Sequence, residues 1–118
     1  MKNAKLDSLN RLLHIKKAIE AIEEYVKSEN AESFCINRMV HDAVLFQFTV
    51  IGETIIHVDS KITASINYPW YKVRAFRNFI AHEYFNTKLS AVWGIIDREL
   101  PHLKEVIVQV INEIESKN

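Results

Sequence analysis

The chain has 118 residues, of which 48% are hydrophobic and 25% are charged, a balance typical of one globular domain over residues 1–118. Its 15 basic and 15 acidic residues cancel. A neutral chain argues against a nonspecific nucleic-acid binder, because such proteins gain most of their affinity by neutralising phosphates. Two glycines and two prolines are few, which favours helices with short connections over sheets with tight turns.

Cys35 is the single cysteine, which excludes an internal disulfide and a thiolate metal cluster. No apolar run reaches the roughly 18 to 20 residues of a membrane span, and residues 1–10 lack the apolar core of a signal peptide. We therefore expect a cytoplasmic protein with no membrane association. No H-E-x-x-H motif or zinc-cluster spacing is present, so we expect no metal and no cofactor.

Apolar residues recur at spacings of three and four in successive segments, which is the period of an amphipathic helix. This pattern predicts helices at about 4–28, 37–58, 70 to 82 or 84, 89–99, and from Pro101 onward. The intervening segments are polar or carry no clear period. The expected fold is all-α, a compact five-helix bundle.

The predicted helix 37–58 is apolar nearly all round, which indicates either a central helix or a second face for a partner subunit. Gly52 lies in its middle, where glycine costs roughly 1 kcal/mol relative to alanine. A close crossing with another helix is one reason to tolerate that cost.

The stretch R-N-F-I-A-H-E-Y at 77–84 contains the pattern R-x4-H-x-Y. Its residue types suit metal-free cleavage of RNA. His82 can move a proton near neutral pH and so activate the 2′-hydroxyl for attack on the adjacent phosphate. The Arg77 guanidinium can pair with that phosphate and stabilise the developing charge. Asn78 can hold one imidazole nitrogen and so set the tautomer.

The spacing of Arg77 and His82 puts them about 140° apart around a helix and roughly 7.5 Å apart along it. One straight helix therefore cannot aim both side chains directly at one atom. A two-fold dimer could bring two copies of the motif together, because such an interface repeats one patch on both subunits. The spacing hints at a composite site between two protomers.

A local basic strip precedes the histidine, because no acidic residue interrupts residues 70–81. It contains Lys72, Arg74 and Arg77. Three nearby aromatic residues could stack on unpaired RNA bases: Trp70, Tyr71 and Tyr84. The strip predicts contact with RNA on a protein that is neutral overall.

Each of these residues also has a structural reading. An arginine and a histidine five residues apart occur often by chance. His82 could be structural or merely exposed, and Arg77 could form an ordinary surface salt bridge. Tyr84 could be a half-buried core tyrosine with a satisfied hydroxyl. The residues by themselves leave both readings open.

The stretch 77–85 resembles the signature of the HepT-like family of the HEPN (higher eukaryotes and prokaryotes nucleotide-binding) superfamily. The likeness covers nearly the whole chain. Further matching segments are Asp42-Ala43-Val44, Ile51-Gly52-Glu53, Pro69-Trp70, Val92-Trp93 and L-P-H-L-K at 100–104. Thr54 departs from the small residue that the family often has after Ile51-Gly52-Glu53, but it does not touch the motif.

The resemblance implies a five-helix HEPN bundle that acts as a homodimeric, metal-independent endoribonuclease, the toxin of a toxin–antitoxin pair. Carried over to this chain, Arg77 and His82 are catalytic, and Asn78 is supporting. The implied partner is an MntA-type minimal nucleotidyltransferase that transfers AMP from ATP to Tyr84 and so silences the toxin. The added nucleotide would bring bulk and negative charge to the place where RNA docks.

The roles of two acidic residues stay open. Asp42 and Glu53 could orient Arg77 or His82 across the bundle, or they could cap and salt-bridge locally. Two other functions also remain: a non-catalytic helper that binds nucleotide or presents substrate to a nucleotidyltransferase, and a pure dimerisation module in which the motif serves structure. Cleavage of RNA separates the leading hypothesis from both.

Overall fold

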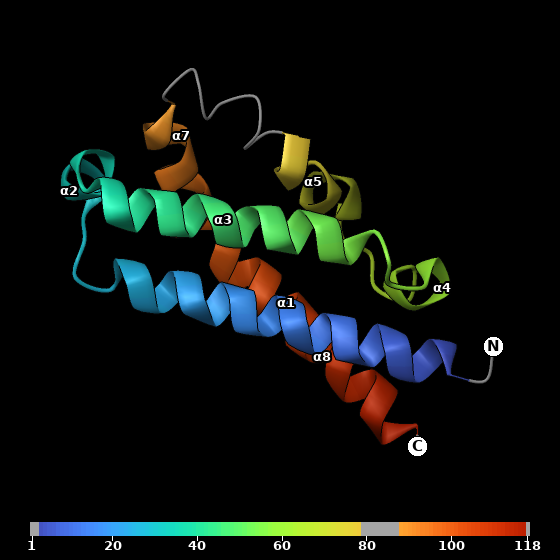
Figure 1. The fold of residues 1–118 in the computed structure, drawn as a ribbon. Helices are drawn as coiled ribbons and strands as arrows, with labels where there is room; N and C mark the ends of the chain where they lie inside the picture. Colours follow the sequence, from blue (N-terminus) through green and yellow to red (C-terminus); the bar gives the residue numbers. More distant parts are fainter. Residues whose placement is uncertain (1–2, 79–87, 118) are drawn as a thin grey trace.

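A computed structural model describes residues 3–78 and 88–117. The elements in these ranges are all helical, which confirms the predicted fold class. They are α1 (Ala4–Val26), α2 (Ala31–Ile36), α3 (Arg38–Ile55), α4 (Ser60–Thr63), α5 (Trp70–Arg74), α7 (Leu89–Gly94), the π-helix η1 (Ile95–Glu99) and α8 (Leu100–Ser116). Figure 1 shows the long helices α1 and α3 side by side, with α8 crossing α1.

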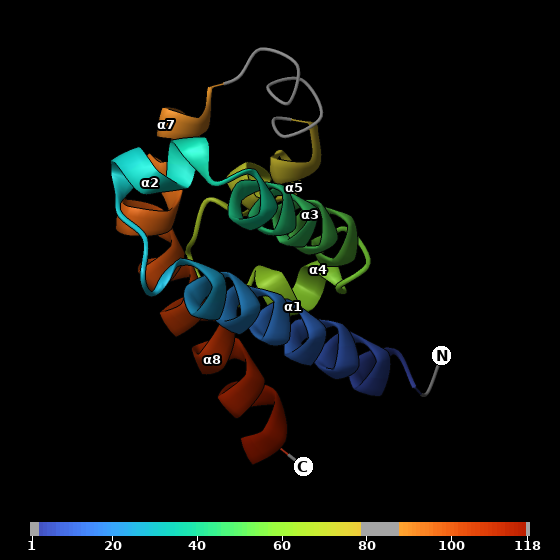
Figure 2. The same ribbon diagram turned by 60° about the vertical axis from the view of Figure 1, so that its left-hand side comes forward.

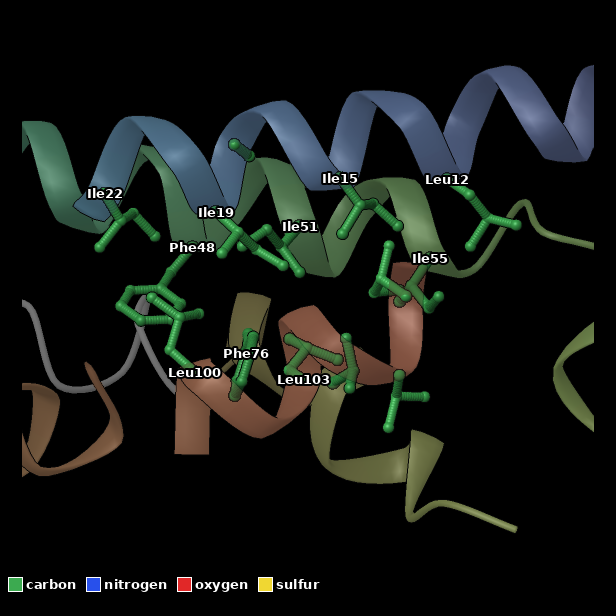
Figure 3. Packing of buried hydrophobic residues seen from close by; sticks show 14 of the residues in the cluster. Leu12, Ile15, Ile19, Ile22, Phe48, Ile51, Ile55, Phe76, Leu100 and Leu103 are labelled. Carbon is green, nitrogen blue, oxygen red and sulfur yellow. The ribbon is translucent and has the colours of Figure 1, made fainter. Parts of the chain in front are cut away.

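The core lies where one face of α1, one face of α3 and one face of α8 meet (Figure 3). Ile15 and Ile19 of α1, Ile51 of α3 and Ile107 of α8 are fully buried. Each such side chain contributes roughly 1.5–3 kcal/mol when it leaves water. Because these residues recur every three or four positions, the helical period by itself aligns them on one face.

The short helices α2 and α4 were not predicted. Asn30 begins α2, because its side chain accepts a hydrogen bond from the Ser33 N–H, and the Ser33 side chain accepts one from Asn30 N–H in return. Asn37 then begins α3 by accepting from the Val40 N–H. Asp59 begins α4 in the same way, by accepting from the Lys61 N–H. Helices of four and six residues are too short to show an apolar period, so their capping residues are the better signal.

The predicted helices 89–99 and from Pro101 onward run together without a loop between them, because α7, η1 and α8 follow one another directly. The Leu100 N–H donates to the Ile95 carbonyl, which is the wider i to i−5 spacing of a π turn. Pro101 lacks an N–H and its ring would crowd the carbonyl four residues earlier in a regular helix. The wider turn directly before it allows the chain to continue as a helix.

Helix α5 packs against α3 on the side away from α1, as both views of the ribbon show (Figures 1 and 2). Residues 76–78 are helical as well, after a turn at Ala75. The Phe76 ring meets the Phe48 ring of α3 edge to face, with 5.1 Å between their centres. This contact seats the segment that leads into the R-x4-H motif on α3.

Candidate functional site

Arg77 sits at a close crossing between the 76–78 segment and α3. A Cβ atom added at Gly52 would lie 2.7 Å from the Arg77 backbone nitrogen and 3.1 Å from the Arg77 Cβ. Neither neighbour is the end of a flexible side chain, so only glycine allows this approach. The expectation that Gly52 marks a close helix crossing is therefore confirmed, and the helix it meets is the one that carries Arg77.

The Arg77 side chain is paired with the residue that follows that glycine. Its Nε lies 2.6 Å from Glu53 Oε2, and the two side chains are 55% and 46% exposed. Of the two roles left open for Glu53, the structure places it across the bundle against Arg77. Helix α3 thus contacts both the backbone and the guanidinium of the same arginine.

Asp42 makes local contacts within the described residues. Its carboxylate lies 3.5 Å from Arg38 Nε and 3.7 Å from His41 Nε2, and all three residues belong to α3. His41 Nδ1 lies 3.1 Å from the Phe34 carbonyl of α2. These are local contacts near the start of α3, and they do not bring Asp42 to Arg77.

The basic strip is solvent-exposed. Lys72 and Arg74 of α5 and the neighbouring Asn78 are all exposed. Tyr71 is 65% exposed. Together with Arg77 they occupy residues 71–78, in which the apolar Val73 and Phe76 are buried.

Trp70 contradicts the prediction that it stacks on RNA bases, because it is only 6% exposed. Its indole N–H donates to the Thr63 carbonyl at 2.8 Å and approaches the Ile66 carbonyl at 3.3 Å. Its ring also packs edge to face on Tyr68, with 5.1 Å between centres. Trp70 anchors the start of α5 in the core and presents no face to solvent.

Tyr68 is half-buried, and its ring lies beside that of the exposed His102 of α8, with 5.3 Å between the ring centres. Burial raises the pKa of the Tyr68 hydroxyl, and the negative charge of Glu99 raises it further. Tyr68 is therefore neutral across the physiological range and serves packing here. His82 and Tyr84, the histidine and tyrosine of the motif, lie outside the described residues.

Within residues 3–78 and 88–117, no group of three or more histidine, cysteine, aspartate or glutamate side chains is placed to hold a metal ion. No helix in the same ranges is both long enough and apolar enough to cross a lipid bilayer.

The fold and this crossing define an all-helical protein with an exposed arginine, held by a glycine and a glutamate of a neighbouring helix, at the start of an R-x4-H-x-Y motif. The model of the family described as "Ribonuclease HepT-like" matches residues 15–110. The chain belongs to this family, which confirms the resemblance seen in the sequence. Ribonuclease activity is the function that family membership supports.

Curated relatives carry matching names. The chain is 30% identical over 105 residues to "Gamma-glutamylcyclotransferase and putative RNase MJ0434" of Methanocaldococcus jannaschii, covering 88% of this chain and 47% of that protein. It therefore spans about half the length of that relative. It is 27% identical over 91 residues to "Probable ribonuclease HepT" of Thermococcus cleftensis, covering 76% of this chain and 83% of that protein. No solved structure matches the chain.

Proposed function

We propose that the protein is a metal-independent endoribonuclease that cleaves RNA with Arg77 and His82. The observation that carries the proposal is the state of Arg77, which is 55% exposed yet held in place by α3. The backbone of Arg77 meets α3 at Gly52, and Glu53 pairs with its guanidinium, so an exposed cation is located beside the motif. The exposed Lys72 and Arg74 beside it supply further charge for a phosphate backbone.

The proposed reaction uses the RNA's own nucleophile. His82 accepts the proton of the 2′-hydroxyl, and the 2′-oxygen attacks the adjacent phosphorus. The bond from phosphorus to the 5′-oxygen breaks, and that oxygen takes a proton from solvent water as it leaves. The products are a 2′,3′-cyclic phosphate and a 5′-hydroxyl end. Arg77 stabilises the charge that builds on the phosphate, and Asn78 orients the imidazole.

A second copy of the chain is the proposed partner across α3. Met39 and Phe46 are 86% and 64% exposed, and they lie on α3 fourteen and seven positions before Glu53. Residues seven apart share a helix face to within about 20°. The exposed apolar stripe therefore leads directly to the Arg77–Glu53 pair. A two-fold dimer through this stripe would bring the two Arg77 residues to one cleft.

The proposed regulation is that of a toxin–antitoxin pair in the cytoplasm. The Tyr84 phenol attacks the α-phosphate of ATP, held by an MntA-type nucleotidyltransferase, and pyrophosphate leaves as the phenol loses its proton. The AMP added two residues from His82 places a negative charge where an RNA phosphate must bind. Like charges at that spot oppose binding, so the modified protein is silent.

The test is cleavage of a mixed-sequence RNA by the unmodified protein in excess EDTA. Cyclic-phosphate ends should form with the wild type, and Arg77→Ala or His82→Ala should slow cleavage by about a hundredfold or more. Lys88→Ala, a charge removed outside the motif, serves as the control. Binding of nucleotide without cleavage would favour the helper function instead.

The regulatory arm is tested by intact mass after co-expression with a neighbouring nucleotidyltransferase. An increment of one AMP or more should appear and should map to Tyr84, and it should be absent from Tyr84→Phe. An unmodified protein beside an active transferase would contradict this arm and leave the nuclease proposal standing.

A further inference from the structure

Two adjacent residues of α3 act on one arginine. Gly52 admits the Arg77 backbone to a distance at which any Cβ would collide, and Glu53 lies against the Arg77 side chain. A pair formed by chance on the surface would need no such backbone approach. The two contacts together fix the position of the Arg77 backbone and the position of its guanidinium group.

The Glu53 carboxylate meets the guanidinium at Nε, with 2.6 Å between Nε and Oε2. A guanidinium carries five N–H donors in a rigid, planar fork. When the Nε side faces a carboxylate, the two terminal nitrogens point outward as a matched pair of donors. That outer edge is the geometry that pairs with two oxygens of one phosphate.

We propose that Glu53 is a positioning residue for RNA cleavage, acting through Arg77 without touching the RNA. This inference rests on the proposed ribonuclease function. Glu53 holds the guanidinium plane so that its outer edge meets the scissile phosphate as charge develops there. Pre-organised donors of this kind act mainly on the transition state, because they need no rearrangement at the moment of reaction.

The same carboxylate has an opposite effect on binding. Glu53 is 46% exposed and negatively charged, so it repels the RNA backbone in the ground state. Replacing it by glutamine should therefore leave RNA binding equal or slightly tighter while slowing the chemical step. This split between KM and kcat distinguishes positioning from general damage, which would not improve binding while slowing catalysis.

The experiment compares Glu53→Gln, Glu53→Asp and Arg77→Lys with the unmodified wild-type protein. We expect Glu53→Gln to lower kcat by about tenfold to a hundredfold with an unchanged or lower KM. Glu53→Asp should recover part of the loss, because it keeps a carboxylate. The recovery should be incomplete, because the side chain is one methylene shorter. Arg77→Lys should not recover activity, because one ammonium cannot face Glu53 and present two matched donors to a phosphate.

The matched control is Glu23→Gln. Glu23 also forms an ion pair between two helices, with 2.9 Å to Lys104 Nζ and a side chain 42% exposed, but it lies against α8. Its removal should leave both kcat and KM unchanged. An equal loss in Glu23→Gln and Glu53→Gln would overturn the positioning role, since it would show that any lost surface pair slows the enzyme.

A second measurement decides the contact without using activity. In protein labelled with ¹⁵N-arginine, the Arg77 Nε–H should exchange slowly with water in the wild type and several-fold faster in Glu53→Gln, with no change in Glu23→Gln. Faster exchange without a change in kcat would sink the positioning role. No cleavage by the wild type would overturn the proposed function and the catalytic role of Glu53 together, while the exchange data would still report on the pair.

Discussion

Two ion pairs join separate helices within the described ranges, and they differ in their surroundings. Glu23 of α1 meets Lys104 of α8 at 2.9 Å, between two helices that pack through their apolar faces. Glu53 of α3 meets Arg77 at 2.6 Å, beside Gly52, whose lack of a side chain allows the Arg77 backbone to approach. The first pair borders an ordinary helix packing. The second is built into a crossing that only one residue type allows.

This difference teaches that the distance in an ion pair says little about its role. Exposed pairs contribute roughly 0–1 kcal/mol to stability, and both pairs are partly exposed. The two pairs differ in the residues around them. Gly52 lowers the stability of α3 by roughly 1 kcal/mol relative to alanine, and it allows an exposed guanidinium to be held at a defined position.

The dimer prediction concerns the exposed face of α3 that carries Glu53. Phe46→Glu should weaken self-association by more than about 2 kcal/mol, because it buries a charge in the stripe that leads to Glu53. Light scattering coupled to gel filtration should report a monomer. Leu6→Glu on α1 is the control, since Leu6 is 55% exposed outside the stripe, and it should leave the mass unchanged. A dimer that survives Phe46→Glu would place the interface elsewhere.

The glycine prediction tests how closely α3 and the 76–78 segment cross at Gly52. Gly52→Ala should destabilise the protein by about 1–3 kcal/mol in urea unfolding, because the new Cβ would lie 2.7 Å from the Arg77 nitrogen. Gly94→Ala is the matched control. There the new Cβ would meet only the end of the Arg98 side chain, which can move away. Gly94→Ala should be neutral or gain up to about 1 kcal/mol from helix propensity.

The aromatic prediction separates anchoring from RNA contact on α5. Trp70→Phe should cost about 1–3 kcal/mol of stability, because the Thr63 carbonyl loses its indole N–H donor. RNA affinity measured under folding conditions should not change. Tyr71→Ala should do the reverse, weakening RNA binding by roughly 1–3 kcal/mol with little loss of stability. Reduced RNA affinity in folded Trp70→Phe would restore the stacking prediction.

The smallest effect belongs to the Glu23–Lys104 pair. The hydrogen bond to Glu23 raises the pKa of Lys104 above its usual value of 10.5, with the charges of Glu23 and Glu20 adding to it and partial desolvation opposing it. A raised folded pKa means that the stabilisation is complete below the unfolded pKa and is lost as the pH rises through the folded one. Wild-type stability should therefore decline above about pH 10.5 by less than about 1 kcal/mol relative to Lys104→Met. Equal pH dependence in the two proteins would show that the pair contributes nothing.

Much of the fold was predictable because helical periodicity is a local property. The expected helix 4–28 corresponds to α1 (Ala4–Val26), and the expected helix 37–58 corresponds to α3 (Arg38–Ile55). The short helices α2 and α4 were missed, because a few residues cannot display a period. The continuous run of α7, η1 and α8 through Pro101 was not predicted. Proline predicts the start of a helix, but not the π turn that lets a helix continue through it.

The site divided along the same line. The R-x4-H-x-Y pattern and the family were readable from neighbouring residues. Whether Glu53 reached Arg77 was not, because the two residues are distant in the chain and meet only through the packing of α3. The same two roles were open for Asp42, which is also a carboxylate, yet it pairs with Arg38 on its own helix.

The sequence by itself determined the helical class, the apolar stripes that become the core, and the motif that marks the family. Each of these depends on residue identity and on spacing within a few turns of one helix. Only the tertiary structure decided that Trp70 is a buried anchor, and that Gly52 and Glu53 hold Arg77. These outcomes depend on which helix faces cross and how closely, and that is set by the packing of the whole core.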